Sequence, residues 1–370
     1  MTTYKTFSTP AYNVRYSCFG DAEHPAEYHA IIHPVPGVPL DVQLSAINSG
    51  EALLRASLGP SVRPVFRRWF LSDPANQAQL LPADDSCAVS VVGQPPLSRN
   101  MPKAVLWLYL QEDADICRLP GELTRVKAPD GTVRYWQGTC CVPGADSFEA
   151  TEKLLSAYSD TLRNLGLSLE ADCMRTWFFV RDVDRNYAGL VTARNEVFAR
   201  EGLTAHSHFI ASTGIGAMPP STDVTVSLDT FAVAGLKKGA VRHLKGSTHL
   251  SPTADYGEAF ERATAIEFPD RRHVLVSGTA SIDNKGEIVH PGDIVRQTTR
   301  MCENVEVLLA EAGCTGADMT QAIVYVRDVA DGRTVGAMIA DRYPGVPFVV
   351  VLGPVCRPGW LVEMECMAVR

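Results

Sequence analysis

The sequence predicts an α+β protein built from two tandem β-α-β-α-β-β domains, in which helices cover one face of mixed sheets. The prediction rests on internal repetition. The tetrapeptide Val-Arg-Asp-Val occurs at 180–183 and again, 146 residues later, at 326–329. A pattern of apolar positions at 151–165 recurs 143 residues later at 294–308. Matches in the same order indicate a duplicated domain, so differences between the copies point to functional residues.

Each copy contains the same order of elements. A strand that ends in Gly-Thr leads into a helix whose apolar positions recur at i, i+4, i+7 and i+11, which is one helical stripe. The Val-Arg-Asp-Val strand, a second helix and two closing strands follow. The last strand, at 226–233, matches 362–369 at an offset of 136 residues. We therefore expect the two copies to fold alike.

The repeat also divides the chain. We expect residues 1–90 to add strands and loops to the first domain, which residues 91–235 complete as a degenerate copy. Residues 236–262 are polar and contain glycine and lysine, so we expect a connector there. Residues 263–370 then form the second domain, which carries the catalytic residue.

Composition excludes several classes of partner. The 370 residues include 34 Lys and Arg against 42 Asp and Glu, a net charge of −8, and no basic block. Nucleic acid and membrane are therefore not expected partners. No apolar run approaches the roughly 20 residues that span a bilayer, and the N-terminal segment lacks the apolar core of an export signal. Ten cysteines without a C-x-x-C pair favour a reducing compartment, so we expect a cytoplasmic protein.

A difference between the copies identifies the first candidate residue. Glu363 and Glu365 alternate along an apolar strand and so share one of its faces. Their equivalents in the first copy are Ser227 and Asp229, so one of the two carboxylates is present in a single copy. A carboxyl group in an apolar pocket has a raised pKa and can donate a proton near neutral pH. An isolated glutamate on an edge strand would instead face solvent.

Other polar residues carry weaker signals. Arg181 and Arg327 occur in both copies, which favours a structural role. His206 and His208 point the same way on a strand, but no further ligand stands near them, so we expect no metal site. The glycines of 213–217 lack the lysine of a phosphate loop.

The second copy resembles the Rid (YjgF-type, chorismate-mutase-like) domain over about 100 residues. The matching segments are SGTASID, LLAEAG, IVYVRDVAD and LVEME, at 277–283, 308–313, 323–331 and 361–365. Rid imine deaminases carry an arginine just before the penultimate strand, where it binds the substrate carboxylate. Here that position is Val346, which weakens the imine-deaminase interpretation.

Over roughly residues 90–370, the chain resembles the chorismatase family. The segments MRTWFFV, STGIG and YGEAFERAT, at 174–180, 212–216 and 256–264, carry this resemblance together with Tyr187 and Arg194. It implies an enzyme that acts on chorismate, releases pyruvate and uses neither a cofactor nor a metal.

The resemblance also implies roles for individual residues. Glu363 would protonate the enolpyruvyl group. Arg194 and Arg262 would bind the substrate carboxylates, since the guanidinium group pairs with carboxylate in a bidentate manner. Tyr187, two helical turns before Arg194, and Tyr256 would line the same site. Each of these four binding residues has a simpler interpretation as a surface residue.

Two positions indicate the product. Family members that hydrolyse chorismate to a diene diol resemble SATA where this chain has SGTA, and they lack a cysteine seven residues before the glutamate. Here Gly278 and Cys356 occupy these positions, as in members that make 3-hydroxybenzoate. Glycine leaves room for the ring to shift, so that an internal oxygen attacks instead of water. Simpler roles are a turn glycine and a packed thiol.

The sequence therefore predicts a chorismatase that forms 3-hydroxybenzoate and pyruvate. Alternatives are hydrolysis to the diene diol, mixed formation of 3- and 4-hydroxybenzoate, a non-catalytic small-molecule-binding protein, and imine deamination. Single-copy Rid domains resemble trimers with sites between subunits, so a monomer with an internal site and a trimer are both open.

Overall fold

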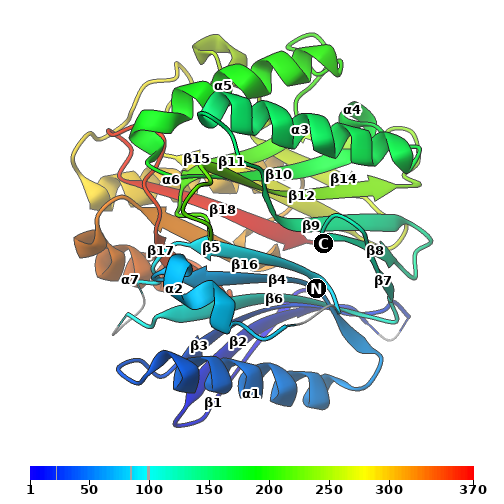
Figure 1. The fold of residues 1–370 in the computed structure, drawn as a ribbon, viewed down its shortest axis with the longest axis vertical. Coiled ribbons are helices and arrows are strands. Elements are labelled where there is room, and N and C mark those ends of the chain that lie inside the picture. Colours follow the sequence, from blue (N-terminus) through cyan, green and yellow to red (C-terminus); the bar gives the residue numbers. More distant parts are fainter. Residues whose placement is uncertain (22, 84–85, 98–100) are drawn as a thin grey trace.

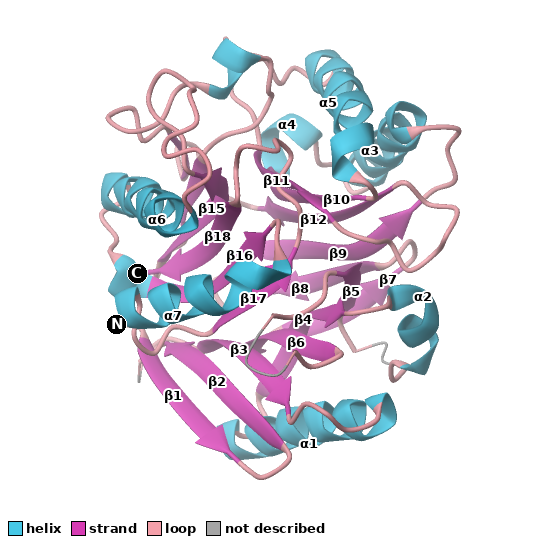
Figure 2. Cartoon of the chain, turned by 90° about the vertical axis from the view of Figure 1, so that its left-hand side faces the viewer, coloured by secondary structure: helices cyan, strands magenta, loops and turns pink. Residues whose placement is uncertain are grey.

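The computed structural model describes residues 1–21, 23–83, 86–97 and 101–370. Within them the chain forms three six-stranded mixed sheets. The strands lie inside, with α1 at one end, α3 and α5 at the other, and α6 and α7 along one side (Figures 1 and 2). No helix in these ranges is long and apolar enough to cross a membrane. The predicted α+β class with mixed sheets is confirmed.

The N-terminal unit, residues 3–112, forms the first sheet. Its strands are β1 (Thr3–Ser8), β2 (Tyr12–Phe19), β3 (Glu27–Pro34), β4 (Val62–Leu71), β5 (Ala88–Gly93) and β6 (Ala104–Glu112). One long helix, α1 (Leu40–Leu58), packs on this sheet, and α2 (Pro74–Gln77) and a 3-10 turn (Ala78–Leu80) follow β4.

The middle unit, residues 115–234, forms the second sheet. Its strands are β7 (Asp115–Leu119), β8 (Leu123–Lys127), β9 (Val133–Cys141), β10 (Cys173–Val180), β11 (Ala211–Gly216) and β12 (Val226–Ala234). Two long helices, α3 (Ser147–Asn164) and α5 (Val183–Arg200), lie side by side over it, and α4 (Leu169–Asp172) precedes β10.

The C-terminal unit, residues 241–369, forms the third sheet. Its strands are β13 (Val241–Leu244), β14 (Ala263–Glu267), β15 (Arg272–Ala280), β16 (Met319–Val326), β17 (Phe348–Leu352) and β18 (Val362–Val369). Helices α6 (Ile294–Glu311) and α7 (Gly332–Arg342) cover it, and 3-10 turns occur at Thr253–Tyr256, Gly316–Asp318 and Val329–Asp331. The expected connector, 236–262, thus contains β13 and a 3-10 turn.

The three sheets share one topology. In each, the strands lie in the order first, second, third, sixth, fourth, fifth. The fourth strand of each unit also carries one bulge residue at the same point: Val65, Met174 and Thr320. The common bulge fixes the register and identifies equivalent positions without reference to sequence identity.

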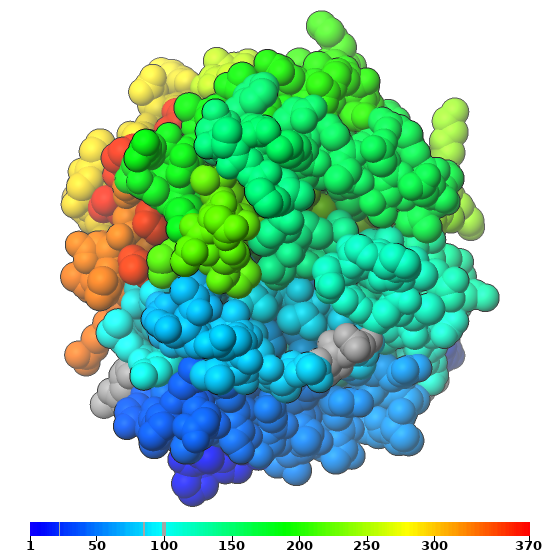
Figure 3. Space-filling model, viewed as in Figure 1, coloured from blue at the N-terminus to red at the C-terminus, as the bar shows by residue number. Residues whose placement is uncertain are grey.

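Equivalent hydrogen bonds close the units into a ring. The residue that ends each fifth strand donates its N–H to the carbonyl two residues beyond the fifth strand of the next unit. These bonds are Gly93 to Met218 (2.8 Å), Gly216 to Pro354 (2.9 Å) and Leu352 to Pro95 (2.8 Å). In Figure 3 the N-terminal unit (blue) covers the lower part of the visible face and the middle unit (green) the upper part.

The third sheet is the main difference from the sequence prediction, which assigned residues 1–90 to strands and loops of a first domain. Two features of the N-terminal unit hide the repeat. Its second helix is reduced to the four residues Pro74–Gln77. Its fourth strand also lacks the Val-Arg-Asp-Val ending, reading VRPVFRRWFL. The alternation of two helices with strands is therefore absent from its sequence.

The repeated elements end close to where the pattern predicts. Helix α6 begins after Asp293, whose carboxylate accepts the N–H of Arg296 at 3.0 Å. It ends before Gly313, whose φ of +72° suits a glycine after a helix C-terminus. The strands β10 and β16 stop at the first valine of each Val-Arg-Asp-Val segment. The remainder of each segment turns towards the following helix.

A buried ionic network joins all three sheets. Arg68 of β4 pairs with Asp229 of β12 at 2.8 Å and lies 3.6 Å from Glu365 of β18. Arg175 of β10 pairs with Glu365 at 2.9 Å. Trp177 donates its indole N–H to the same carboxylate at 2.8 Å. All four charged side chains are at most 2% exposed, so each depends on its partners to offset the loss of hydration.

Removing one cation from this network should destabilise the fold. We expect Arg68→Met to lower the free energy of unfolding by about 3–5 kcal/mol, because Asp229 would remain buried without its partner. Denaturant unfolding followed by circular dichroism measures the change. As a control, Arg200→Met removes an exposed pair with Glu152 and should cost at most about 1 kcal/mol. Equal losses for the two variants would contradict the assignment.

Candidate active site

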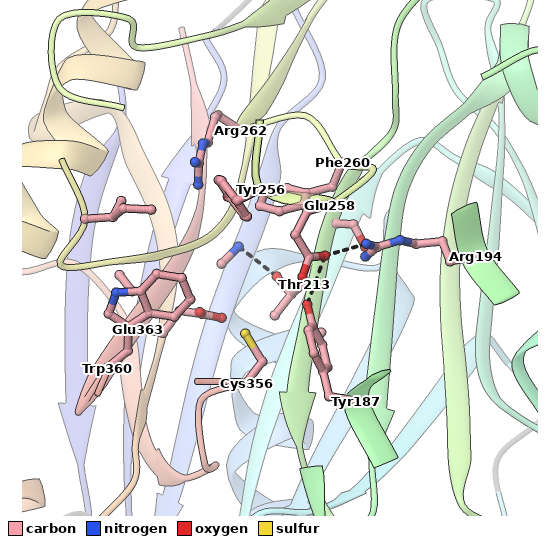
Figure 4. A pocket seen from close by; sticks show the side chains of 15 residues that line it. Tyr187, Arg194, Thr213, Tyr256, Glu258, Phe260, Arg262, Cys356, Trp360 and Glu363 are labelled. Carbon is pink, nitrogen blue, oxygen red and sulfur yellow. Dashed lines mark hydrogen bonds and ion pairs between the residues drawn. The ribbon is translucent and has the colours of Figure 1, made fainter. Parts of the chain in front are cut away.

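The seven site residues predicted from the sequence line one cavity between the middle and C-terminal units. They are Tyr187, Arg194, Tyr256, Arg262, Gly278, Cys356 and Glu363. Figure 4 shows the side chains of all of them except Gly278 pointing towards one another. The other lining residues are Ser212, Thr213, Gly214, Glu258, Phe260, Ala280, Ile282 and Trp360. The site is therefore internal to the chain, at the junction of two sheets.

Segments of both units build the cavity. Helix α5 supplies Tyr187 and Arg194, and β11 of the same unit supplies Thr213. The C-terminal unit contributes the end of β15 and the start of β18, which lie paired in the sheet. The segment 256–262 forms the remaining wall, held by the amide of Asn195, which donates to the Gly257 carbonyl at 2.9 Å. The candidate acid and the candidate substrate cations thus come from different units.

Glu363 has the environment of a proton donor. Its side chain is buried, and within the described residues its carboxyl group has no hydrogen-bond partner. Burial, and then the negative charge of nearby Glu365, raise the pKa of Glu363 to about 8. The carboxyl group is therefore mostly protonated at pH 7. It lies directly over Gly278, where a Cβ atom would overlap it.

Thr213 connects the cavity to the buried ionic network. Its hydroxyl group donates to Glu365 at 2.5 Å and accepts the backbone N–H of Gly278 at 2.9 Å. Arg175 donates to the same hydroxyl oxygen at 2.6 Å. The network thereby holds the end of β15 at Gly278, which the Glu363 carboxyl group contacts.

Arg194 has a carboxylate partner within the protein. It pairs with Glu258 at 2.5 Å and is 1% exposed. The Tyr187 hydroxyl group donates to the same carboxylate at 3.3 Å (Figure 4). Burial, first of all, raises the pKa of Tyr187, so it remains a neutral hydrogen-bond donor. A ligand carboxylate that reaches Arg194 must therefore replace or accompany Glu258.

Arg262 is differently placed. It donates to the Ser251 carbonyl at 2.9 and 3.2 Å, and its guanidinium lies 5.5 Å from the Tyr256 ring and 5.3 Å from the Phe260 ring. Among the described residues it forms no ion pair with a carboxylate. Nearby, Arg357 stacks over Tyr256, 4.8 Å from its ring. Arg262 is therefore the buried cation of this cavity that a ligand carboxylate can neutralise.

Cys356 lies between the acid and the tyrosine (Figure 4). Burial, with a contribution from the Glu363 charge, raises the pKa of its thiol far above the ordinary value. It is therefore a neutral lining group and not a nucleophilic thiolate. Trp360 closes the neighbouring wall, and its indole N–H donates to the Ser281 carbonyl at 3.2 Å.

The remaining void is small. It measures about 30 Å³, the space of a single water molecule, because Tyr256, Glu258 and Phe260 fill one side. A six-membered ring needs more space than this void, so we expect a substrate to displace part of the lining.

The other polar residues noted in the sequence lie outside this cavity. His208 stacks on His243 at 4.2 Å and contacts the Glu170 carbonyl at 3.0 Å, while His206 is exposed. Among the described residues no three metal-ligating side chains cluster. Arg327 pairs with Asp184 at 2.6 Å and so ties the C-terminal unit to α5. Residues 213–217 run along β11 into the ring-closing turn.

Sequence reasoning missed several residues of the site. Glu258 lies within the segment that carried the family resemblance, between Tyr256 and Arg262, but its pairing with Arg194 has no sequence signal. Thr213 was noted only within a glycine-containing strand. Arg175 and Trp360 were not predicted as site residues, because their hydrogen bonds to Glu365 and Ser281 join positions more than 75 residues apart in the chain.

Comparisons with known proteins agree with this architecture. Residues 251–370 match the family model described as Endoribonuclease L-PSP. A 3-hydroxybenzoate synthase of Streptomyces hygroscopicus is 28% identical, with 74% of this chain and 85% of the relative aligned. A 3-aminoacrylate deaminase, RutC, of Acinetobacter baylyi is 31% identical over 26% of this chain and 77% of the relative.

A crystal structure of a chorismatase superimposes with a TM-score of 0.65 and 20% identity, covering 83% of this chain and 93% of the other. This likeness establishes the common fold. The chain belongs to the Rid (L-PSP) family. Over most of its length it is similar to a 3-hydroxybenzoate synthase, and it shares the fold of a chorismatase.

The environment of Glu363 predicts its titration. We expect the protonated carboxyl signal in an infrared difference spectrum between the parent protein and Glu363→Gln to persist at pH 7. It should disappear as the pH rises through about 8. Burial is the main cause, because the charged form loses its hydration there. Disappearance near the ordinary glutamate pKa of about 4.3 would contradict a protonated acid.

Proposed function

We propose that the protein converts chorismate to 3-hydroxybenzoate and pyruvate. The observation that carries the proposal is the buried Glu363 carboxyl group, whose pKa burial raises to about 8 and which lies over Gly278. The same cavity contains the Arg262 cation, which has no ion-pair partner among the described residues. A relative over 74% of this chain is named 3-hydroxybenzoate synthase. Chorismate and the two products together contain the same atoms, so the reaction requires neither water nor an external oxidant.

In the proposed reaction Glu363 gives its proton to the enolpyruvyl methylene carbon. The resulting oxocarbenium-like group leaves as pyruvate, taking the ether oxygen and the electrons of the bond to the ring. The neighbouring ring hydroxyl oxygen then bonds to the vacated carbon and releases its proton, forming an epoxide. Opening of the epoxide with loss of a ring hydrogen as a proton gives 3-hydroxybenzoate. Two protons are consumed, one by the methylene carbon and one by the epoxide oxygen as the ring opens. Two are released, one from the ring hydroxyl group and one from the ring carbon, so Glu363 regains its proton.

The cations of the cavity support a dicarboxylate substrate. Arg262 is available for one carboxylate, because its partners among the described residues are the carbonyl and hydroxyl oxygens of Ser251 and aromatic rings, with no carboxylate. Arg194 serves the second carboxylate once the substrate displaces Glu258. That displacement and the outward movement of 256–262 are one event, since Glu258 lies on the segment that fills the void.

Gly278 and Cys356 support the aromatising outcome over hydrolysis. The absence of a Cβ atom at Gly278 lets the Glu363 carboxyl group reach its position. Cys356 presents a neutral, apolar surface beside that group, which disfavours a positioned water.

Two alternatives predict other outcomes. A non-catalytic binding protein would have no use for a carboxyl group kept protonated near pH 7. Imine deamination would require an arginine before the fifth strand that lines the cavity. That strand is β11, where the position equivalent to Val346 is Ile210, and both side chains are buried and apolar.

The first test is turnover. Incubation with chorismate should release equal amounts of pyruvate, detected by a coupled lactate dehydrogenase assay, and of 3-hydroxybenzoate, detected by chromatography. Glu363→Gln should lower kcat by about 10²–10⁴-fold, because the amide cannot donate an equivalent proton. Exposed Glu303→Gln is the matched control and should retain activity. A diene diol as the sole product, or an active Glu363→Gln variant, would refute the proposal in this form.

The second test concerns product choice. In Gly278→Ala the added methyl group would overlap the Glu363 carboxyl group, which must rotate away. We expect kcat to fall at least about tenfold and the product to shift towards the diene diol, because the ring loses the room for internal attack.

Chromatography of the products measures this change. Gly336→Ala, where a Cβ atom makes only an ordinary 3.6 Å contact, is the control. An unchanged product ratio in Gly278→Ala would remove Gly278 from this role.

A further inference from the structure

The ring of three units contains three equivalent junctions, which differ in whether side chains fill the space between the two units. The junction between the middle and C-terminal units holds the candidate active site. The junction between the N-terminal and middle units is filled. There Thr139 accepts the N–H of Val91 at 2.6 Å and donates its own N–H to Asp229 at 2.7 Å, and a Cβ atom at Gly138 would overlap the Val89 carbonyl. The third junction, between the C-terminal and N-terminal units, is open.

The open junction contains a cavity of about 890 Å³, within the usual range for small-molecule pockets. Helix α7 and β17 form one side, and β2 and β3, with Leu97 and Met101 beyond β5, form the other. Figure 2 shows α7 above these strands of the N-terminal unit. The same elements, taken from the next pair of units, build the candidate active site.

The shared register makes the comparison exact at the level of residues. Arg15 precedes Tyr16, which pairs with Ala30, and Arg262 precedes Ala263, which pairs with Val276.

Ala30 and Val276 in turn pair with Leu108 and Cys366, which occupy equivalent positions after the common bulge. Arg15 is therefore the positional equivalent of Arg262. The middle unit has Glu122 at this position. An arginine is therefore present at the active-site junction and at the open junction, and it is absent from the filled junction.

Further lining residues correspond. Leu97, four residues beyond the end of β5, matches Cys356, four residues beyond the end of β17. Arg333 stands 146 residues after Tyr187, the offset of the Val-Arg-Asp-Val repeat. The residue at the position of the candidate acid, Glu363, is different in the open junction.

Phe70 pairs with Val105 as Tyr325 pairs with Glu363, so a valine replaces the glutamate at this junction. The open junction therefore retains an arginine for binding but lacks the proton donor.

The chemistry of the lining residues defines the ligand. Arg15 is partly buried, its guanidinium lies 5.7 Å from the Phe348 ring, and among the described residues it has no ion-pair partner. Arg333 likewise pairs with no described carboxylate. No Asp or Glu is present among the described lining residues.

The other walls are Leu97, Phe348 and Val350, which are apolar. His33 adds a ring nitrogen, Nδ1, that has no hydrogen-bond partner in the described part of the chain. Burial lowers the pKa of His33 to about 4, so it contributes a neutral polar contact.

We propose that this cavity is a second, non-catalytic binding site for a small aromatic carboxylate, with Arg15 as the residue that binds the carboxylate. The proposal goes beyond the proposed function, because binding here requires no turnover. A planar ring suits the apolar walls, and a single carboxylate suits an arginine without a partner.

Benzoate is the probe, and calorimetric titration is the measurement. The variant Arg262→Ala removes the equivalent cation of the candidate active site and isolates the second cavity. We expect this variant to bind one benzoate per chain. Adding Arg15→Ala should weaken that binding at least tenfold. Adding Arg63→Ala, an exposed arginine of the same sheet outside the cavity, should leave it unchanged.

A second variant tests the cavity without changing Arg15, in case Arg15→Ala disturbs folding. Ala337→Trp in the Arg262→Ala background fills the cavity from the exposed face of α7 and should also abolish binding. Circular dichroism establishes that each variant is folded. Failure of Arg262→Ala to bind benzoate, or binding unaffected by Arg15→Ala, would overturn the proposal. If inorganic phosphate competed with benzoate as well as benzoate itself binds, the site would not be specific for aromatic carboxylates, and this part of the proposal would be overturned.

Chorismate turnover by the single variant Arg15→Ala separates the two proposals. Retained turnover with lost second-site binding supports the second site as distinct from the first. If the parent protein fails to turn over chorismate while the benzoate result holds, only the proposed function fails.

Discussion

The structure depends on a buried ionic network that no single unit can satisfy. Arg68 comes from the N-terminal unit, Arg175 and Asp229 from the middle unit, and Glu365 from the C-terminal unit. Removing such charges from water costs several kcal/mol per ion, which only the assembled partners offset. A unit that folded alone would lack the partners that the other units supply. The network therefore selects the closed ring over other packings of three similar sheets, and the ring in turn creates junctions where sites can form.

The same network sets the chemistry of the candidate acid. Glu365 holds a negative charge two residues from Glu363 and, after burial, contributes most to the raised pKa of Glu363. Arg175 acts in the opposite direction, and its pairing with Glu365 limits the effect. Thr213 transmits the arrangement to the backbone of Gly278, beneath the acid. A structural ion cluster and a proton donor on one strand thus share their electrostatics, which explains why both carboxylates stand on the same face of β18.

The fold class and the duplicated copies could be predicted from the sequence, because periodicity and repeats are local signals. The residues that converge on the cavity could be predicted because they lie in or near the motifs of the family resemblance. The matched strands of the two copies differ at one position, where the second copy has Glu363 and the first copy has Ser227. The N-terminal unit was not recognised, because strand topology survived there after the helices and motifs had diverged. The pairing of Glu258 with Arg194 was also beyond reach. It depends on how a turn-containing segment folds over α5, and no spacing rule encodes that contact.

A three-unit chain differs from a symmetric trimer in one respect that follows from its covalent structure. Each junction can change independently, since a substitution appears once and not three times. Here the junctions have separated into a filled one at Thr139, one with the acid Glu363, and one with an arginine but no acid. At the filled junction Thr139 forms hydrogen bonds with the backbone of Val91 and with Asp229. The other two retain space beside equivalent arginines, Arg262 and Arg15. Duplication followed by independent change thus lets a single chain hold a protonated acid at one junction without imposing its desolvation cost on the others.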